Sequence, residues 1–278
     1  MANFDFSKEG KFAKKAMEQA RYSKMKRTMN KERELGQRLD MIEAGPKLDR
    51  RKAKQPVGKA KQPVINSLIE RGFRKNHRLI AVGGGITQDV TAFISSILYR
   101  GVQWYFFPTT LLSQGDSCIG SKTSINFGRF KNQLGGFYPP NKIFIFPEFL
   151  NTLSIAEMKS GMGEMLHYFI VSGKSDFDFY RNNYKQAFID KNILAKIISR
   201  SLKIKKRYIE KDEYDQNIRQ VFNYGHSFGH AIESLTNYKI PHGVAVSFGM
   251  DIANFISVKM GFINKEIRQE IREVTEYI

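Results

Sequence analysis

The spacing of apolar and polar residues separates an N-terminal segment from the rest of the chain. Residues 12–42 are rich in Lys, Arg, Glu, Met and Ala and contain no Pro, which predicts a helix with few apolar positions. Residues 45–64, GPKLDRRKAKQPVGKAKQPV, repeat KQPV in a Lys- and Pro-rich run, which is typical of an extended, solvated linker. We therefore expect residues 1–64 to be a basic helical or disordered extension and linker, with a domain boundary near Val64.

Residues 65–149 alternate between strand-like and helical patterns. A short helix, NSLIERGF, precedes the apolar strand RLIAVGGG, and the helical spacing of ITQDVTAFISSILYRG follows its three glycines. VQWYFFP predicts a second buried strand, PTTLLSQGDSCIGSKTSIN a loop, and FKNQLGGFYPPNKIFIFP a turn and a short strand. A strand, a glycine turn and a helix present backbone N–H groups to an anion, typically a cofactor pyrophosphate. GGG is a weaker signal than the full GxGxxG pattern.

Residues 150–278 read almost entirely as helices. The helical segments are NTLSIAEMKSGMGEMLHYFIV, the Lys-rich NILAKIISRSLKIKKRYIE, VFNYGHSFGHAIESL and HGVAVSFGMDIANFISVKMG. The pattern therefore predicts an α/β nucleotide-binding part over residues 65–149 followed by an all-helical part over residues 150–278.

Charge and cysteine content narrow the functional classes. The formal net charge is +18, and residues 1–64, with 18 Lys/Arg and 8 Asp/Glu, carry +10 of it. A basic extension attached to a moderately basic body differs from a domain with a basic face that binds nucleic acid. The extension also lacks the interleaved aromatic residues that a protein binding single-stranded nucleic acid would use. One cysteine, no apolar run of about 20 residues and no secretory signal predict a cytoplasmic protein without a membrane role.

Two of the five histidines, His226 and His230, stand four residues apart in one predicted helix. They share a helix face, which allows both side chains to reach one site. This spacing alone leaves open whether they are metal ligands, acid/base groups or ordinary helix residues. Glu164, flanked by glycines in GMGEMLH, and His242, which opens the next helix in PHGVAV, add a carboxylate and a further imidazole. One carboxylate and two or three imidazoles from three helices fit a catalytic divalent site with an open coordination position.

Several blocks of the chain together resemble the 3-dehydroquinate synthase family of sugar-phosphate cyclases. They are GGGITQDVTAFISSILYRG, FPTTLLSQGDSCIGSKTSIN, KNQLGGFYPP, GMGEMLHY, NYGHSFGHAIE and PHGVAVSFGM, in this order between about residues 65 and 265. The resemblance implies a partial Rossmann-like nucleotide-binding domain followed by an all-helical metal-binding domain. It also implies bound NAD, a divalent ion (Zn²⁺, or Co²⁺ or Fe²⁺), a homodimer, and a place in aromatic amino acid biosynthesis.

The resemblance also assigns roles to single residues. The metal ligands would be Glu164, His226 and His242. The catalytic and substrate-contacting residues would be Asp116, Lys122, Lys131, Asn132, His167, Arg219, Asn223 and His230. The cofactor-binding residues would be Gly83, Gly84, Gly85, Asp89, Thr109 and Thr110, with Asp116, Lys122 and Lys131. The reaction implied is conversion of 3-deoxy-arabino-heptulosonate 7-phosphate to a carbocycle with elimination of phosphate.

Some features depart from the family and keep other hypotheses open. His167 stands where the family has a lysine, which predicts a group that titrates near neutrality in place of a fixed cation. Gln88 replaces a glycine of the nucleotide turn, and residues 1–64 resemble none of the family's first strands. The alternatives are another cyclase of the valiolone or deoxyinosose type, an iron-type polyol or glycerol-phosphate dehydrogenase, and an inactive fragment with a basic nucleic-acid-binding arm.

Overall fold

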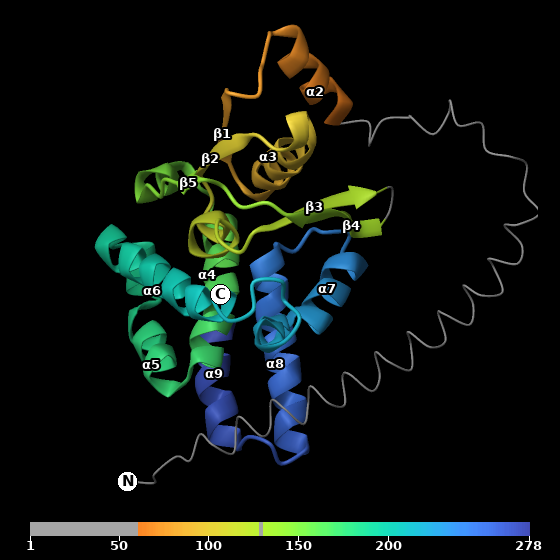
Figure 1. Ribbon diagram of the computed structural model, residues 1–278. Helices are drawn as coiled ribbons and strands as arrows, with labels where there is room; N and C mark the ends of the chain where they lie inside the picture. The colour runs from red at the N-terminus through yellow and green to blue at the C-terminus, as the bar shows by residue number, and fades with distance from the viewer. Residues whose placement is uncertain (1–60, 128–129) are drawn as a thin grey trace, which may run out of the picture. The chain divides into compact units, whose positions relative to one another are not determined.

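Three parallel strands form the sheet of the nucleotide-binding part. The computed structural model describes residues 61–127 and 130–278, and of residues 61–62, 126–127 and 130–131 it describes the backbone alone. Of the expected extension and linker, residues 1–60 lie outside this range, and residues 61–64 are the start of a helix rather than extended chain. The sheet has the order β1 (Arg78–Gly83), β2 (Gln103–Pro108) and β5 (Lys142–Ile143), with Leu79 opposite Trp104 and Gly83 opposite Pro108 (Figure 1). The predicted strands RLIAVGGG and VQWYFFP are thus confirmed.

Helices connect and cover these strands. α2 (Lys61–Glu70) precedes β1, and α3 (Gly85–Ile97) with the short η2 (Leu98–Arg100) leads from β1 to β2. The buried face of the sheet carries Ala81, Trp104 and Phe106, which form one apolar cluster. On β1 the alternate residues Ile80 and Val82 are 63% and 55% exposed. The period-2 pattern of a strand explains this split between the two faces.

A β-hairpin occupies a region where we expected a loop and a turn. β3 (Lys122–Phe127) pairs antiparallel with β4 (Phe130–Phe137), and Thr123 lies opposite Gly136. The expectation was wrong because Ser, Asn and Gly weaken the strand pattern, whereas backbone pairing requires no apolar side chains. Before the hairpin, the π-helical turn η3 (Ser113–Ser117) carries Asp116.

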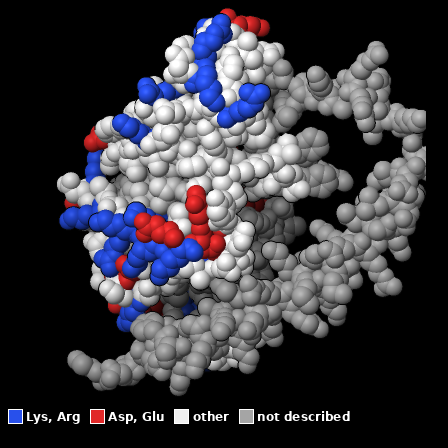
Figure 2. All heavy atoms as spheres, viewed as in Figure 1, with Lys and Arg blue, Asp and Glu red and all other residues white. Residues whose placement is uncertain are grey.

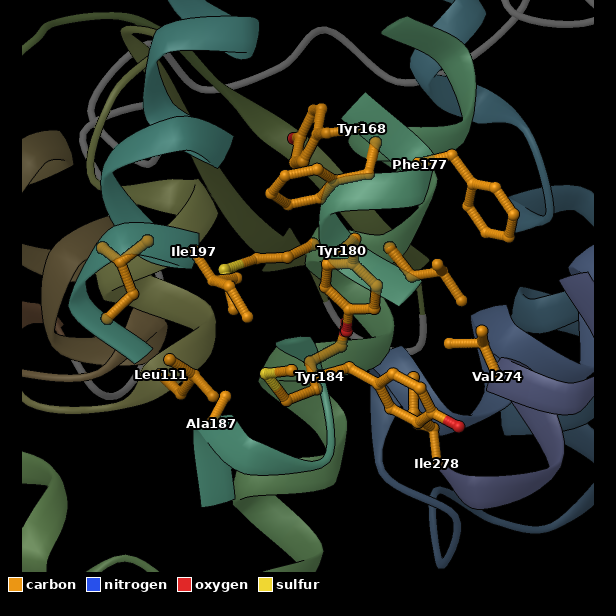
Figure 3. Packing of buried hydrophobic residues seen from close by; sticks show 14 of the residues in the cluster. Leu111, Tyr168, Phe177, Tyr180, Tyr184, Ala187, Ile197, Val274 and Ile278 are labelled. Carbon is orange, nitrogen blue, oxygen red and sulfur yellow. The ribbon is translucent and has the colours of Figure 1, made fainter. Parts of the chain in front are cut away.

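The second part of the chain is helical, as predicted. Its elements are η4 (Pro147–Thr152), α4 (Ile155–Ser172), α5 (Lys174–Asn183), η5 (Gln186–Phe188), α6 (Lys191–Ile209), η6 (Ile218–Asn223), α7 (His226–Leu235), α8 (His242–Lys259) and α9 (Lys265–Tyr277). Ser154 and Glu157 form a capping box that fixes the start of α4. Buried side chains of α4, α5, α6 and α9, among them Tyr180, Ile197 and Val274, form the largest apolar core (Figure 3).

Glycines let α4 and α8 approach each other closely. A Cβ atom on Gly243 would lie 1.8 Å from the backbone oxygen of Ser160, and one on Gly163 would lie 2.3 Å from the backbone oxygen of Gly243. The N–H of Gly243 donates to the Ser160 hydroxyl at 3.0 Å. The crossing therefore depends on hydrogen at both positions, and it fixes the start of α8 beside the middle of α4.

In the described part of the chain, no helix combines the length and apolar character needed to cross a membrane.

Candidate metal and substrate site

Three helices bring Glu164, His226 and His242 together. Glu164 lies in the middle of α4, while each histidine is the first residue of its helix, α7 or α8. His226 Nε2 is 3.5 Å from Glu164 Oε1, and His242 Nε2 is 3.3 Å from Glu164 Oε2. One ligand atom from each residue lies within 4.8 Å of the other two. The expected cluster of one carboxylate and two imidazoles is therefore present in space.

The pKa values of Glu164 and His242 are shifted by the charged groups that surround them in this cluster. Burial alone would raise the pKa of Glu164, but its interactions with His226 and His242 hold that pKa well below its usual range. Burial opposes protonation of His242, yet Glu164 and Glu233 raise its pKa to about 9. Glu164 is only 4% exposed. A buried carboxylate that needs positive charge around it is well suited to a cation.

His230 takes a place beside these residues rather than among them. Its ring centroid is 5.5 Å from that of His226 and 5.6 Å from that of His242, and its side chain is exposed. With Glu233 and His242 it also belongs to a second group of residues that could hold an ion. The geometry thus separates the two histidines of GHSFGH, because only His226 faces Glu164.

Asp116 lies in a compact polar cluster next to the candidate metal ligands. Lys205 Nζ is 2.6 Å from Asp116 Oδ1 and 2.8 Å from the backbone oxygen of Asp116. The Tyr168 hydroxyl donates to the same carboxylate oxygen. Burial, followed by the charge of Asp116, raises the pKa of Tyr168 well above its usual range, so the phenol stays protonated. The Tyr168 ring is 3.9 Å from that of His167, which joins this cluster to Glu164.

Lys205 is a residue of this region that the sequence interpretation missed. It lies in the Lys-rich run of α6, whose other basic residues gather on the surface (Figure 2). Lys203 and Lys206 are exposed, whereas Lys205 is 6% exposed. A helical wheel of this segment could have indicated that Lys205 is buried, because Lys205 is four residues after the buried Ser201 and lies beside Ile204 on the apolar face of the helix.

Arg219 and Lys122 approach the same region from other elements. Arg219 is buried; its Nη1 donates to the backbone oxygen of Glu213 at 2.6 Å and its Nη2 to that of Gly120 at 3.1 Å. Lys122, at the start of β3, pairs with Asp215 at 2.5 Å and is half exposed. Both cations are therefore fixed at the junction of the hairpin and the segment between α6 and η6.

His167 differs from the expectation that it titrates near neutrality. Complete burial lowers its pKa to about 4, against the opposing charge of Glu164. The imidazole is therefore neutral at physiological pH. Neither ring nitrogen has a hydrogen-bond partner among the described residues. A buried polar group without such a partner is costly, and the charged group that faces Nδ1 is the Glu164 carboxylate, at 3.9 Å.

The glycine turn after β1 has the geometry of an anion cradle. The N–H of Thr109 donates to the oxygen of Gly83 at 2.9 Å and so ties the end of β2 to the turn. A Cβ atom on Gly84 would lie 2.9 Å from the Thr110 methyl group, while one on Gly85 would meet open space. No side chain caps the N-terminus of α3. The turn therefore offers backbone N–H groups on an open side.

Asp89 and Gln88 follow this turn on α3. Burial raises the pKa of Asp89 to about 6, although the backbone of Ser124 donates to it. Gln88, the departure from the family glycine, is buried; it donates to the oxygen of Ser117 at 2.6 Å and accepts from the Ser117 hydroxyl at 2.8 Å. Its amide thus joins α3 to the turn that carries Asp116.

Three predicted substrate contacts are less defined. Asn132 lies on β4 with φ of 55°, Asn223 is the last residue of η6, and both side chains are exposed. The side chain of Lys131 lies outside the described residues. Their roles stay predictions.

Family models match nearly all of the described chain. The 3-dehydroquinate synthase N-terminal model matches residues 49–160 and the C-terminal model matches residues 161–278. The chain belongs to the 3-dehydroquinate synthase family. The 3-dehydroquinate synthase of Prochlorococcus marinus (strain MIT 9515) is 42% identical over 213 residues, which are 74% of this chain and 59% of that protein. The chain thus matches less than two thirds of the length of such relatives.

Solved structures of sugar-phosphate cyclases share the fold. A 2-deoxy-scyllo-inosose synthase complexed with carbaglucose-6-phosphate, NAD⁺ and Co²⁺ is 26% identical, with a TM-score of 0.73 over 78% of this chain and 59% of that one. ValA, a 2-epi-5-epi-valiolone synthase from Streptomyces hygroscopicus with NAD⁺ and Zn²⁺ bound, is 24% identical, with a TM-score of 0.72 over 79% and 62%. These matches confirm the expected α/β fold followed by helices.

Proposed function

We propose that this protein is a metal- and NAD-dependent sugar-phosphate cyclase. The observation that carries the proposal is the junction of two clusters. Glu164, facing two imidazole nitrogens, adjoins His167 and Tyr168, and Tyr168 contacts the part-buried pair of Asp116 and Lys205. A metal-binding set beside buried cations suits a substrate that carries both hydroxyl groups and anions.

The residues present fit both cofactors. Glu164, His226 and His242 would hold a divalent ion, since one carboxylate and two imidazoles are donors that zinc accepts, and Glu164 Oε2 has no well-aligned hydrogen bond among the described residues. The open side of Gly85 and the uncapped α3 fit the diphosphate of NAD. When bound, NAD supplies transient oxidation of a carbinol, and the metal ion polarises the oxygen on which charge builds.

The chain's own residues bind and orient the substrate. Two backbone carbonyls hold the Arg219 guanidinium, whose further N–H groups bind a planar carboxylate or phosphate. Lys205 is held by Asp116 in a buried position, where its charge acts strongly on a nearby anion. Lys122 at the start of β3 adds a cation at the same junction, and His230 contacts the substrate from the exposed side of α7.

We propose 3-deoxy-arabino-heptulosonate 7-phosphate as the substrate and a carbocycle and phosphate as the products. Relatives at about 40% identity named 3-dehydroquinate synthase support this choice. The same proposal divides the chain into a cofactor part over residues 65–149 and a metal and substrate part over residues 150–278. A second candidate is a cyclase for another sugar phosphate, which the neutral, buried His167 in place of the family lysine favours.

Phosphate release tests the proposal. The full chain, supplied with Zn²⁺ and NAD, is incubated with 3-deoxy-arabino-heptulosonate 7-phosphate, with a seven-carbon sugar phosphate that lacks the carboxylate, or with glucose 6-phosphate. We expect inorganic phosphate and a carbocycle from the first substrate, no release by Glu164→Ala, and normal release by Glu276→Gln, a surface control. Release from another substrate alone identifies the second candidate. A folded, metal-loaded, NAD-bound chain that acts on none of the three contradicts the proposal.

A further inference from the structure

The two histidines of the metal group are held in the same way by different acceptors. In each ring Nε2 faces an oxygen of Glu164. His226 Nδ1 is 3.2 Å from the backbone oxygen of Tyr224, and His242 Nδ1 is 3.2 Å from Glu233 Oε1. A neutral imidazole has a single N–H, and when Nδ1 carries it and donates to the Tyr224 or Glu233 oxygen, Nε2 is left with a lone pair that can bind a metal ion.

Glu233 is placed so that it can act on His242 from a rigid position. Glu233 is 5% exposed and lies near the end of α7, seven residues after His226. α7 packs along α8, and a Cβ atom on Gly229 would lie 3.0 Å from the Cα atom of Val246. One helix therefore supplies a candidate ligand at its first residue and, two turns later, the acceptor for the next ligand.

We propose that Glu233 is a positioning residue that holds His242 with its N–H on Nδ1 and its Nε2 lone pair toward the metal. The inference rests on the proposed function, because it assumes that Glu164, His226 and His242 bind the ion. Carboxylates that accept from a ligating imidazole fix its orientation and increase its basicity. Glu233 then contributes to metal affinity without touching the metal.

A second reading of the same contacts makes Glu233 itself a ligand, together with His230 and His242. That arrangement requires His242 Nδ1 as the donor atom. It leaves the buried Glu164, with the imidazole nitrogens of two helices directed at it, outside the site. His230 is exposed, whereas Glu164 is enclosed. Glu164 and Glu233 are both buried, so the choice rests on the imidazoles. Two ring nitrogens are directed at Glu164, whereas the second group depends on the exposed His230, and this geometry favours Glu233 as a positioning residue.

Zn²⁺ affinity of the full chain, measured by competition with a chelator, tests the inference. We expect Glu233→Ala to weaken binding about 10- to 100-fold, since this is the usual effect of losing such an acceptor. Glu233→Gln retains an oxygen that can accept from Nδ1–H, so its loss should be smaller. Glu276→Gln, which removes the same charge from an exposed ion pair, should bind like the wild type. Circular dichroism establishes that each variant is folded, and the Co²⁺ absorption spectrum reports the geometry at the ion.

Each outcome separates the inference from the function on which it rests. Wild-type affinity in a folded Glu233→Ala, or in Glu233→Gln if the alanine variant does not fold, overturns the positioning role and leaves the metal site intact. Loss of binding in Glu233→Gln and His230→Ala, with binding kept in Glu164→Ala, makes Glu233 a ligand and overturns the role as well. A folded wild type that binds no Zn²⁺ removes the metal site and the inference together.

Discussion

Replacement of Gly243 by alanine should disturb both stability and metal binding. Gly243 follows the candidate ligand His242 and lies where α8 crosses α4. Within a helix, Gly→Ala ordinarily stabilises by about 1 kcal/mol. Here the new Cβ atom would stand 1.8 Å from the Ser160 oxygen and 2.8 Å from the Glu164 nitrogen, both backbone atoms that cannot rotate away. The steric effect should therefore exceed the gain in helix propensity.

The expected magnitude follows from these distances. An ordinary contact needs about 3.4 Å or more, so α8 must move away from α4 by more than 1 Å at this point. Overpacking of a tight contact typically costs about 1–3 kcal/mol. For a chain of this size a loss of 1 kcal/mol lowers Tm by about 2–4 °C. The same movement separates His242 from Glu164, so Zn²⁺ affinity should fall as well.

Thermal unfolding and Zn²⁺ titration of Gly243→Ala provide the measurement. Gly85→Ala is the matched control for stability, because Gly85 is also a helix residue and its new Cβ atom would meet open space. We expect Gly243→Ala to lower Tm and weaken Zn²⁺ binding while Gly85→Ala leaves Tm unchanged or raises it. A Gly243→Ala protein with wild-type Tm and Zn²⁺ affinity would refute the argument that this contact positions His242.

Two further predictions concern buried charges. Lys205→Met leaves the Asp116 carboxylate enclosed without its cation, so the free energy of unfolding, measured by urea denaturation, should fall by about 3–5 kcal/mol. Adding Asp116→Asn to the same chain should restore part of this loss, whereas additive losses would contradict the pairing. Asp89→Asn should raise stability at neutral pH, where the buried carboxylate is ionised. The gain should shrink as the pH falls through about 6 toward 4, because wild-type Asp89 then becomes protonated. A gain that does not change with pH would show that burial does not disfavour the charge.

The sequence predicted the helices and the site residues with the clearest local patterns. The strands 78–83 and 103–108 and the helices after residue 150 follow from apolar periodicity, and the resemblance brought Glu164, His226 and His242 to one place. The hairpin of β3 and β4 was not predicted, because its stability comes from backbone pairing between segments of small and polar residues.

Two features of the site depend on contacts between distant segments. A helical wheel places Lys205 on the apolar face of α6, but its partner is recognised only when η3 is seen to pack on α6, which brings Asp116 to a lysine 89 residues away. The pKa of His167 reflects complete burial between Glu164 and Tyr168, whereas the sequence shows only a histidine with an ordinary pKa near neutrality. The homodimer and the cytoplasmic location stay predictions.

The most direct test of the account is the metal content of the purified full chain beside that of Glu164→Gln. Glutamine has the shape of glutamate but lacks the charge that faces His226 and His242. We expect about one divalent ion per wild-type chain, and far less in a Glu164→Gln protein that is equally folded. A folded wild-type protein without metal after exposure to Zn²⁺, or a Glu164→Gln protein that keeps a full complement, would contradict it.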